Sequence, residues 1–293
     1  MLKFGPVNSK TATVSFVSSL CIYGTIGWVL AYVNLPTEVV VVFRGLIGAA
    51  FILVVLFATK RRFDTTAVQA NLGWLAAGGI SLGLNWVFLF AAYRTTTVAV
   101  ASLCNYMAPI MLIVIAPPLL GEPRSMKKAV CAVVAIIGMV LVSGVVEGGA
   151  EGVNAQGIAL GLGAAVFATT LVLSNKKLGD IPVFEKSSVQ LLFATAAALP
   201  FALVVGLAQP LQPDALTVGL VVLLGLLHTG VAYCLYFGGL GHLRAQTAAV
   251  LGYVEPAVSV LVSTTILHEP LSILGWIGAA LIIGAAVASE IAD

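Results

Sequence analysis

Apolar runs of about 20 residues recur along almost the whole chain, and they constrain its fold more than any other feature. A helix needs about 20 apolar residues to cross the hydrocarbon core of a bilayer. This length predicts ten spans, at 11–32, 38–59, 72–93, 97–118, 126–146, 154–175, 184–206, 215–239, 245–267 and 271–289. The runs are continuous rather than alternating, which excludes a membrane β-barrel. The sequence therefore predicts an all-α membrane protein with ten transmembrane helices.

The composition excludes several other classes of protein. Residues of the AVILMFWYC set make up 60% of the chain and charged residues 9%, whereas soluble domains carry roughly 25% charge. No basic tract suggests a nucleic-acid partner, and no G-x-x-x-x-G-K-[ST] loop suggests ATP. His268-Glu269 lacks the second histidine of a zinc protease, and the four cysteines lie in apolar spans without metal-ligand spacing. We therefore expect no cofactor or metal and no enzymatic activity.

The lysines and arginines predict the orientation of the spans, because cytoplasmic loops of membrane proteins are enriched in both residues. If the ten spans alternate, one side receives Arg94 with the acidic residues Glu38, Glu147, Glu151, Asp214 and Glu269. The other side receives Lys3, Lys10, Lys60, Arg61, Arg62, Arg124, Lys127, Lys128, Lys176, Lys177, Lys186 and Arg244. We therefore expect an inner (plasma) membrane protein with both termini in the cytoplasm.

Two stretches of the chain are near-copies of each other. Asn105-Tyr106-Met107-Ala108-Pro109 matches Gly252-Tyr253-Val254-Glu255-Pro256, and Gly121-Glu122-Pro123 matches His268-Glu269-Pro270. Both pairs are 147 positions apart, with no gap needed. A shared spacing of this kind indicates a duplicated unit. The duplication predicts two units, 1–150 and 151–293, each containing five spans.

Five is an odd number of spans, so the second unit is predicted to enter the membrane from the side opposite to the first. Such inverted repeats allow alternating access around a site near the bilayer midplane. Pro109 and Pro256 would break the fourth and ninth spans. A broken helix in a membrane is tolerated where it is buried in protein or lines a water-filled cavity. We therefore expect the breaks to act as hinges beside a cavity.

Two five-helix halves, each with a proline inside its fourth span and a glutamate closing that span, resemble the EamA type of the drug/metabolite transporter superfamily. Residues 105–109 are more specifically similar to the YddG-type amino acid exporters of bacteria. Ala108 stands where that group often has a large aromatic residue, so a strictly aromatic substrate range is not expected. The resemblance implies a cavity between the third, fourth, sixth, eighth and ninth spans, with Tyr106 as a substrate contact.

Glu255 lies near the middle of the ninth span, where an unpaired carboxylate is costly and is expected to face water, a partner or a substrate. Helical spacing places Ala248, Gly252 and Ser259 on the same small, polar face. One interpretation is a cavity carboxylate that meets a substrate amine or a proton. The other is a carboxylate that bonds backbone groups freed by Pro256.

Other polar and aromatic residues are candidates for the cavity. Asn85 and Asn105 need hydrogen-bond partners in a membrane, so both are expected to face the bundle interior. His228 lies at a similar depth, although a lone histidine is more often a packing residue. The aromatic candidates are Trp86, Tyr106, Phe167, Tyr233 and Tyr253, for which helix packing is an equally good interpretation. Together they suggest aromatic walls suited to a zwitterion with an apolar side chain.

Three charged residues have structural interpretations. Arg44 lies close to the outer end of its span, so we favour snorkelling of its side chain to the surface, or an ion pair, over a role in the substrate site. Glu122 and Glu269 close matching spans at opposite membrane faces and are expected to be structural, with a possible role in the gates. The pairs Gly79/Gly83 and Gly157/Gly161 have the spacing that permits close helix approach.

The sequence thus favours a secondary transporter that exports amino acids, both aromatic ones and others with neutral, apolar side chains, through the lipid bilayer, with protons as an open possibility for coupling. A second interpretation is export of drugs or other metabolites. A third, an intramembrane enzyme using Glu255 and His228, requires a second acid or a metal ligand at the same depth, and the sequence offers none there.

Overall fold

The computed structural model describes residues 9–96, 98–142, 145–148, 154–208, 210–266 and 272–291. These residues fold into fifteen α-helices and one π-helical turn, and no strand occurs among them. The elements are α1 (Ser9–Gly24), α2 (Ile26–Leu30), α3 (Thr37–Ala58), α4 (Thr65–Thr95), α5 (Val98–Asn105), α6 (Ala108–Leu120), α7 (Met126–Val142), α8 (Val145–Gly148), α9 (Ala155–Lys177), α10 (Val183–Ala208), α11 (Ala215–Gly225), η1 (Leu226–Val231), α12 (Ala232–Leu240), α13 (Ala245–Leu251), α14 (Val254–Ile266) and α15 (Ile273–Ile291).

Among the described residues, seven helices are long and apolar enough to cross a membrane. Three of them join consecutive elements: Lys10–Leu30 joins α1 and α2, Val100–Leu120 joins α5 and α6, and Ala215–Leu240 joins α11, η1 and α12. The other three predicted spans fall on α7, on α13 with α14, and on α15. These are helical, but they are either shorter or interrupted. The prediction of an all-helical membrane protein is confirmed.

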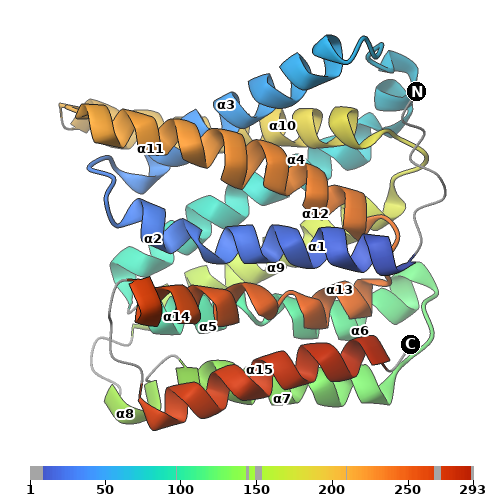
Figure 1. The fold of residues 1–293 in the computed structure, drawn as a ribbon, viewed down its shortest axis with the longest axis vertical. Helices are drawn as coiled ribbons and strands as arrows, with labels where there is room; N and C mark the ends of the chain where they lie inside the picture. Colours follow the sequence, from blue (N-terminus) through green and yellow to red (C-terminus); the bar gives the residue numbers. More distant parts are fainter. Residues whose placement is uncertain are drawn as a thin grey trace.

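The helices lie roughly side by side (Figure 1). When each helix is replaced by the equivalent helix of the other predicted half, the same pairs of helices pack together. The helix α1 packs against α12 and α14, and α9 packs against their counterparts α4 and α6. In the same way α3 packs against η1, and α10 packs against α4. In two further pairs, α3 with α10 and α7 with α15, each helix packs against its own counterpart in the other half.

Glycines allow the closest of these contacts. A Cβ atom on Gly79 or Gly83 of α4 would lie 2.5 Å or 2.3 Å from a backbone oxygen of α10. On α9, a Cβ atom on Gly157 or Gly161 would lie 2.5 Å or 2.6 Å from the Cβ of Thr96 or Cys104. Both small-residue pairs predicted from the sequence therefore lie where helices approach each other closely, as is common in membranes.

The outer surface of the bundle is apolar. Large aliphatic side chains on several helices are mostly exposed, including Val54 at 63%, Val204 at 71% and Ile273 at 80%. Because water would penalise such exposure, these faces suit contact with lipid chains.

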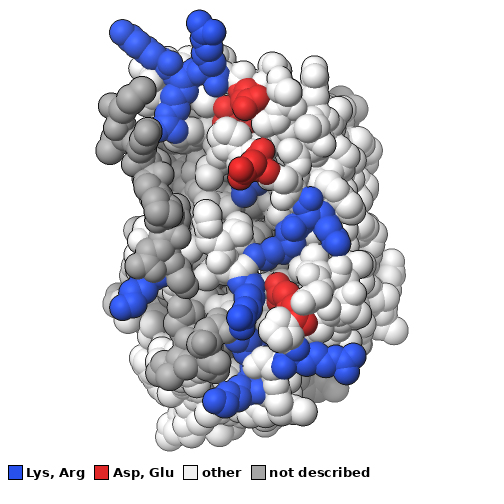
Figure 2. Space-filling model, turned by 90° about the vertical axis from the view of Figure 1, so that its right-hand side faces the viewer, with Lys and Arg blue, Asp and Glu red and all other residues white. Residues whose placement is uncertain are grey.

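Charged residues gather at one end of the bundle. The helix α1 begins and α15 ends at this end, on the right in Figure 1. Figure 2, which views that side, shows Lys and Arg spread over it. At the opposite end α11 begins at Asp214, whose carboxylate accepts a 2.8 Å hydrogen bond from the Thr217 amide and caps the helix. That bond holds the pKa of Asp214 below its usual range.

The glycine contacts yield a test of the packing. Gly83→Ala is expected to destabilise the protein by about 1–3 kcal/mol, since overpacking of a fixed backbone contact costs that much. The matched control is Gly73→Ala in the same helix, because nothing lies within 4 Å of a Cβ atom there. Thermal unfolding in detergent measures both variants. Equal midpoints for Gly83→Ala and Gly73→Ala would contradict the α4–α10 packing.

Candidate functional site

Two helices are interrupted at equivalent positions near the centre of the bundle. The helix α5 ends at Asn105 and α6 begins at Ala108, while α13 ends at Leu251 and α14 begins at Val254. Pro109 stands in the first turn of α6, where its missing N–H costs nothing, and Pro256 takes the same place in α14. Both prolines are buried inside the protein. The predicted breaks are therefore present in both copies.

The two breaks contact each other through the repeated tyrosines. The Tyr253 hydroxyl donates a 3.0 Å hydrogen bond to the backbone carbonyl of Tyr106, and the two rings lie 6.4 Å apart. This bond satisfies a backbone acceptor at the α5–α6 break, which the helix itself leaves free. Tyr253 is fully buried, so it supports the break and does not line a cavity.

A cavity of about 520 Å³ lies beside the breaks. Elements of both halves line it: α1, α2, α3, α4, α5, α6 and α9, together with α12, α13 and α14. It extends toward the end of the bundle where α2 and α4 finish, past Leu30 and Tyr93. Phe237 and Leu240 of α12, nearer the other end, do not line it and are completely buried. The volume suits a small molecule.

Most of the residues predicted from the sequence line this cavity. They are Asn85, Trp86, Asn105, Tyr106, Pro109, Tyr233 and Glu255. Ala248, Gly252 and Ser259, predicted to share the face of Glu255, line it as well. The five spans expected around the cavity all contribute, and α1, α2 and α3 contribute in addition.

Two other candidates lie away from the cavity. Phe167 packs edge-on against Phe88, with ring centroids 5.1 Å apart, and its neighbour Ala168 faces the cavity instead. His228 is buried within η1, and its Nε2 lies 2.8 Å from the Thr25 hydroxyl. It does not line the cavity with Glu255, so His228 serves to join α11–α12 to the end of α1.

The two predicted asparagines meet at the cavity wall. Asn85 Nδ2 donates a 2.9 Å hydrogen bond to Asn105 Oδ1 and a 2.8 Å bond to the Ala164 carbonyl. These bonds tie α4 to α5 and to α9. The amides thus find their partners inside the bundle, as side chains of this kind require in a membrane.

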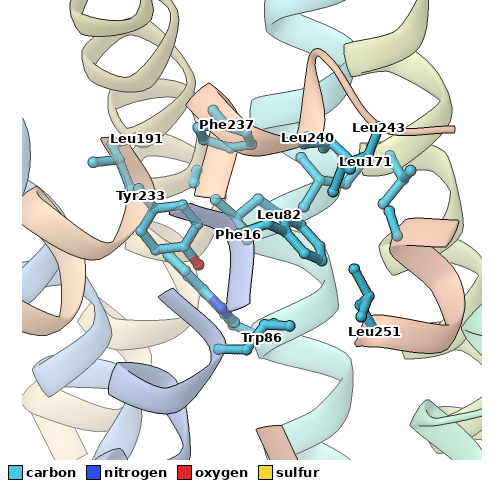
Figure 3. Close-up of a cluster of buried hydrophobic side chains, with 14 of the residues drawn as sticks. Phe16, Leu82, Trp86, Leu171, Leu191, Tyr233, Phe237, Leu240, Leu243 and Leu251 are labelled. Carbon is cyan, nitrogen blue, oxygen red and sulfur yellow. The ribbon is translucent and has the colours of Figure 1, made fainter. Parts of the chain in front are cut away.

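Aromatic side chains form the walls of the cavity. Trp86 and Tyr233, which occupy equivalent positions 147 residues apart, pack edge-on with ring centroids 6.2 Å apart. Figure 3 shows the Tyr233 hydroxyl directed toward Trp86. Tyr23 and Tyr236 extend this wall, with their rings 5.2 Å and 6.3 Å from that of Tyr233. Offset and edge-on contacts of this kind stabilise aromatic clusters.

Arg44 lines the same cavity, which the sequence analysis missed. The expectation that it snorkels or forms an ion pair is wrong. Its side chain is buried, its guanidinium lies over the Trp86 ring at 4.6 Å from the centroid, and no ion pair to it occurs among the described residues. The stacking partner is on another helix, so spacing along α3 alone gives no sign of it. Arg94, in contrast, pairs with Glu38.

The Glu255 carboxylate faces the cavity from α14. No hydrogen bond to it is recorded in the described part of the chain, so the alternative role of bonding backbone groups freed by Pro256 is not seen. A charge at the bilayer centre costs on the order of 3 kcal/mol on insertion scales. Arg44 and Glu255 each lie within the electrostatic range of the other.

Glu122 closes the end of the bundle that the cavity does not reach. Its carboxylate accepts hydrogen bonds from the Ala245 amide at 2.8 Å and from Gln246 Nε2 at 3.3 Å. It thereby caps the start of α13 from the end of α6, joining the two halves. Its predicted structural role is consistent with this geometry. Glu269, its counterpart, lies outside the described residues.

Buried amines reinforce the same end. Lys186 Nζ donates to the Phe237 carbonyl at 2.8 Å, and Lys128 Nζ donates to the Thr247 hydroxyl at 2.6 Å. Lys176 Nζ donates to the carbonyls of Leu240 and Leu243. The last carbonyls of α12 are thus satisfied by amines from α9 and α10, a favourable arrangement at a helix C-terminus.

Comparisons with known proteins agree with this architecture. The model of the EamA-like transporter family matches the chain twice, over residues 11–144 and 155–289. A solved crystal structure has the same fold, with a TM-score of 0.80, 19% identity and coverage of 96% of this chain and 98% of its own.

Relatives in bacteria and archaea carry transporter names or no stated activity. An uncharacterized transporter, YxxF, of Bacillus subtilis is 24% identical over 87% of this chain and 81% of its own length. Protein PecM of Dickeya dadantii is 29% identical over 73% of each chain. An uncharacterized transporter of Archaeoglobus fulgidus is 28% identical over 66% of this chain and 67% of its own.

The helical membrane bundle with a central cavity, together with the family match, defines the class of protein as a membrane transporter. The chain belongs to the EamA-like transporter family, whose model covers almost all of it in two successive matches. Its substrate is therefore a small molecule.

Removing the Glu122 carboxylate tests the closed end. Glu122→Ala is expected to speed amide hydrogen exchange at Ala245 and Gln246 about 5- to 30-fold, because a lost helix N-cap costs about 1–2 kcal/mol. Asp64→Ala is the control, because Asp64 caps a different helix, α4, through a 2.9 Å bond from the Ala67 amide. Unchanged exchange in Glu122→Ala would show that the carboxylate does not hold this end closed.

Proposed function

We propose that the protein is a secondary transporter that exports neutral amino acids with aromatic or other apolar side chains. The observation that carries the proposal is the cavity itself. Its volume of about 520 Å³ accommodates an amino acid, eight of the thirty residues that line it are aromatic, and both halves of the chain contribute to its lining. The similarity of residues 105–109 to the YddG-type exporters supports the same substrate class.

Alternating access of two inverted five-helix halves would move the substrate. Two observations support the duplication. The family model matches the chain twice, and equivalent helices of the two halves pack in the same way. The breaks at Pro109 and Pro256 supply hinges beside the cavity. In the opposite state the closed end would open, and the cavity mouth between α2 and α4 would close.

The orientation follows from the charges. The end closed by Glu122 carries the exposed Lys60, Arg61 and Arg62 between α3 and α4, and this enrichment favours the cytoplasmic side of the inner membrane. The cavity then faces the outside. This is the state from which an exporter releases its substrate.

Orientation is tested by labelling with a membrane-impermeant thiol reagent in a variant lacking Cys21, Cys104, Cys131 and Cys234. A cysteine at Arg61 is expected to react only in inside-out vesicles, and a cysteine at Glu151 only in right-side-out vesicles. The measurement is the fraction of each cysteine modified. Labelling of both cysteines from the same side would contradict the inverted arrangement and the ten spans.

Transport is tested in proteoliposomes loaded with radiolabelled phenylalanine, leucine or alanine. Wild-type protein is expected to accelerate efflux of at least one of them above protein-free liposomes. No acceleration for any of them would reject the substrate class. Xenobiotic cations measured in the same assay would then identify a drug exporter.

Glu255→Gln tests the role of the cavity carboxylate in that assay. We expect flux to fall about tenfold or more, because hydrogen bonds to a charged group contribute about 1.5–3 kcal/mol. Flux is measured with and without a pH gradient. If the gradient drives wild-type flux and not that of Glu255→Gln, the carboxylate carries the coupled proton, whereas near-normal flux in the variant would remove Glu255 from the mechanism.

A further inference from the structure

We propose that Arg44 and Glu255 together form the site for the charged groups of a zwitterion, with Arg44 binding the carboxylate and Glu255 the ammonium group of one α-amino acid. The inference deepens the proposed function and rests on it, because it assigns the recognition of the substrate class to two named residues. Arg44 has so far only been placed in the cavity, without a role.

The charge inventory of the cavity is the first observation. In the parts of the chain that the structure describes, thirty residues line it, and the formally charged ones are Arg44 and Glu255. One is positive and one is negative, so the cavity is electrically balanced without a ligand. A ligand with a single charge would unbalance it, whereas a zwitterion pairs with both charges at once.

The second observation is that, among the described residues, no hydrogen bond or ion pair to either charged group is recorded. Arg44 Nε is buried without a hydrogen bond, and Glu255 accepts no recorded bond within the described residues. The two do not form an ion pair with each other, although each lies within the other's electrostatic range. A buried guanidinium and a carboxylate that remain unpaired beside a cavity leave their bonding capacity to a ligand.

Arg44 is also held in place before any ligand arrives. Its guanidinium stacks on Trp86 at 4.6 Å from the ring centroid, and Trp86 is itself packed against Tyr233. No hydrogen bond engages its Nε, and the edge of a guanidinium plane matches a carboxylate with two parallel N–H bonds. An ordered side chain loses little entropy on binding.

The two charged residues have no charged counterpart in the other half of the chain. One aromatic position of the wall recurs, since Trp86 corresponds to Tyr233 at a separation of 147 positions. The charges do not: Glu255 corresponds to Ala108, and the positions 146 and 147 residues after Arg44 are the fully buried Gln190 and Leu191. The equivalent positions in the other half are occupied without a charge, which favours a role for Arg44 and Glu255 in the ligand site.

The two charges belong to different halves of the chain, Arg44 to α3 and Glu255 to α14. A zwitterion held by both would link the halves across the cavity. A ligand with one charge would bind to one half alone. The pair thus gives a physical reason why an amino acid, and not an amine or an acid of the same shape, would stabilise closure around the cavity.

Binding of three matched compounds tests the proposal. L-phenylalanine, phenethylamine and 3-phenylpropanoate share the phenyl group and differ in which charges they carry. Trp86 lines the cavity and Trp28, Trp74 and Trp276 do not, so a variant with phenylalanine at those three positions reports binding through Trp86 fluorescence. We expect L-phenylalanine to bind at least tenfold more tightly than either single-charge compound.

The substitutions at the two charged residues are then expected to spare different single-charge compounds. Arg44→Gln is expected to weaken L-phenylalanine at least tenfold and to leave phenethylamine as tight or tighter. Glu255→Gln is expected to weaken L-phenylalanine and to leave 3-phenylpropanoate as tight or tighter. Arg44→Lys keeps the positive charge and serves as a control for misfolding. It should bind L-phenylalanine more weakly than the wild type and still prefer it over phenethylamine.

The matched control is the other arginine–glutamate pair. Arg94 and Glu38 contact each other and do not line the cavity, so Arg94→Gln and Glu38→Gln should leave the three affinities unchanged. Equal losses for all three compounds in Arg44→Gln, or no preference for L-phenylalanine in the unsubstituted site, would overturn the proposal. No binding of any of the three would overturn it as well.

The outcome is distinguishable from that of the proposed function. The expected binding signatures without any amino acid flux would support the charge pair and reject export. Amino acid flux with the signatures absent would support export and reject the charge pair.

Discussion

The backbone groups at a helix break must find partners in a medium that offers none, and the rest of the structure depends on this constraint. A break facing lipid would leave carbonyl and amide groups unsatisfied at several kcal/mol each. Here the breaks before Pro109 and Pro256 are enclosed by the other helices, and the Tyr253 hydroxyl bonds the Tyr106 carbonyl. The breaks therefore fix where the bundle is hollow, and the hollow is where a substrate is handled.

Around that constraint the two halves share a scaffold and differ in detail. The aromatic positions and the helix pairing recur, whereas the cavity charges and the amines at the closed end occur once. The closed end is held by Glu122 and by lysines that cap α12. In an alternating-access protein, each open state has one end of the cavity closed and the other end open to the ligand. This asymmetry would be consistent with such a state.

Much of the fold was predictable because its signals are local. Apolar runs gave the helices, the prolines and their spacing gave the breaks, and the need of an amide for a partner placed Asn85 and Asn105 inside. The residues that were misplaced depend on neighbours in space. His228 was a cavity candidate because of its depth in the span, but it lies in the π-helical turn at Leu226–Val231 and meets Thr25 instead.

Arg44 shows the same limit more sharply. Its distance from the end of its span suggested snorkelling, and only the position of Trp86 on another helix reveals the stacking that keeps it in the cavity. Phe167 was one position away from the residue that faces the cavity, which no spacing rule resolves. The helical membrane fold could thus be inferred from the sequence, whereas the site required knowing which helices touch.

The most direct test of the account is the distance across the closed end in the working protein. Spin labels at Arg124→Cys and His242→Cys, two exposed positions that flank Glu122 and Ala245, would be measured in proteoliposomes with and without a transported amino acid. The account predicts a short distance matching the closed end and a second, longer population whose weight changes with the amino acid. A single short distance under conditions that sustain flux would contradict alternating access.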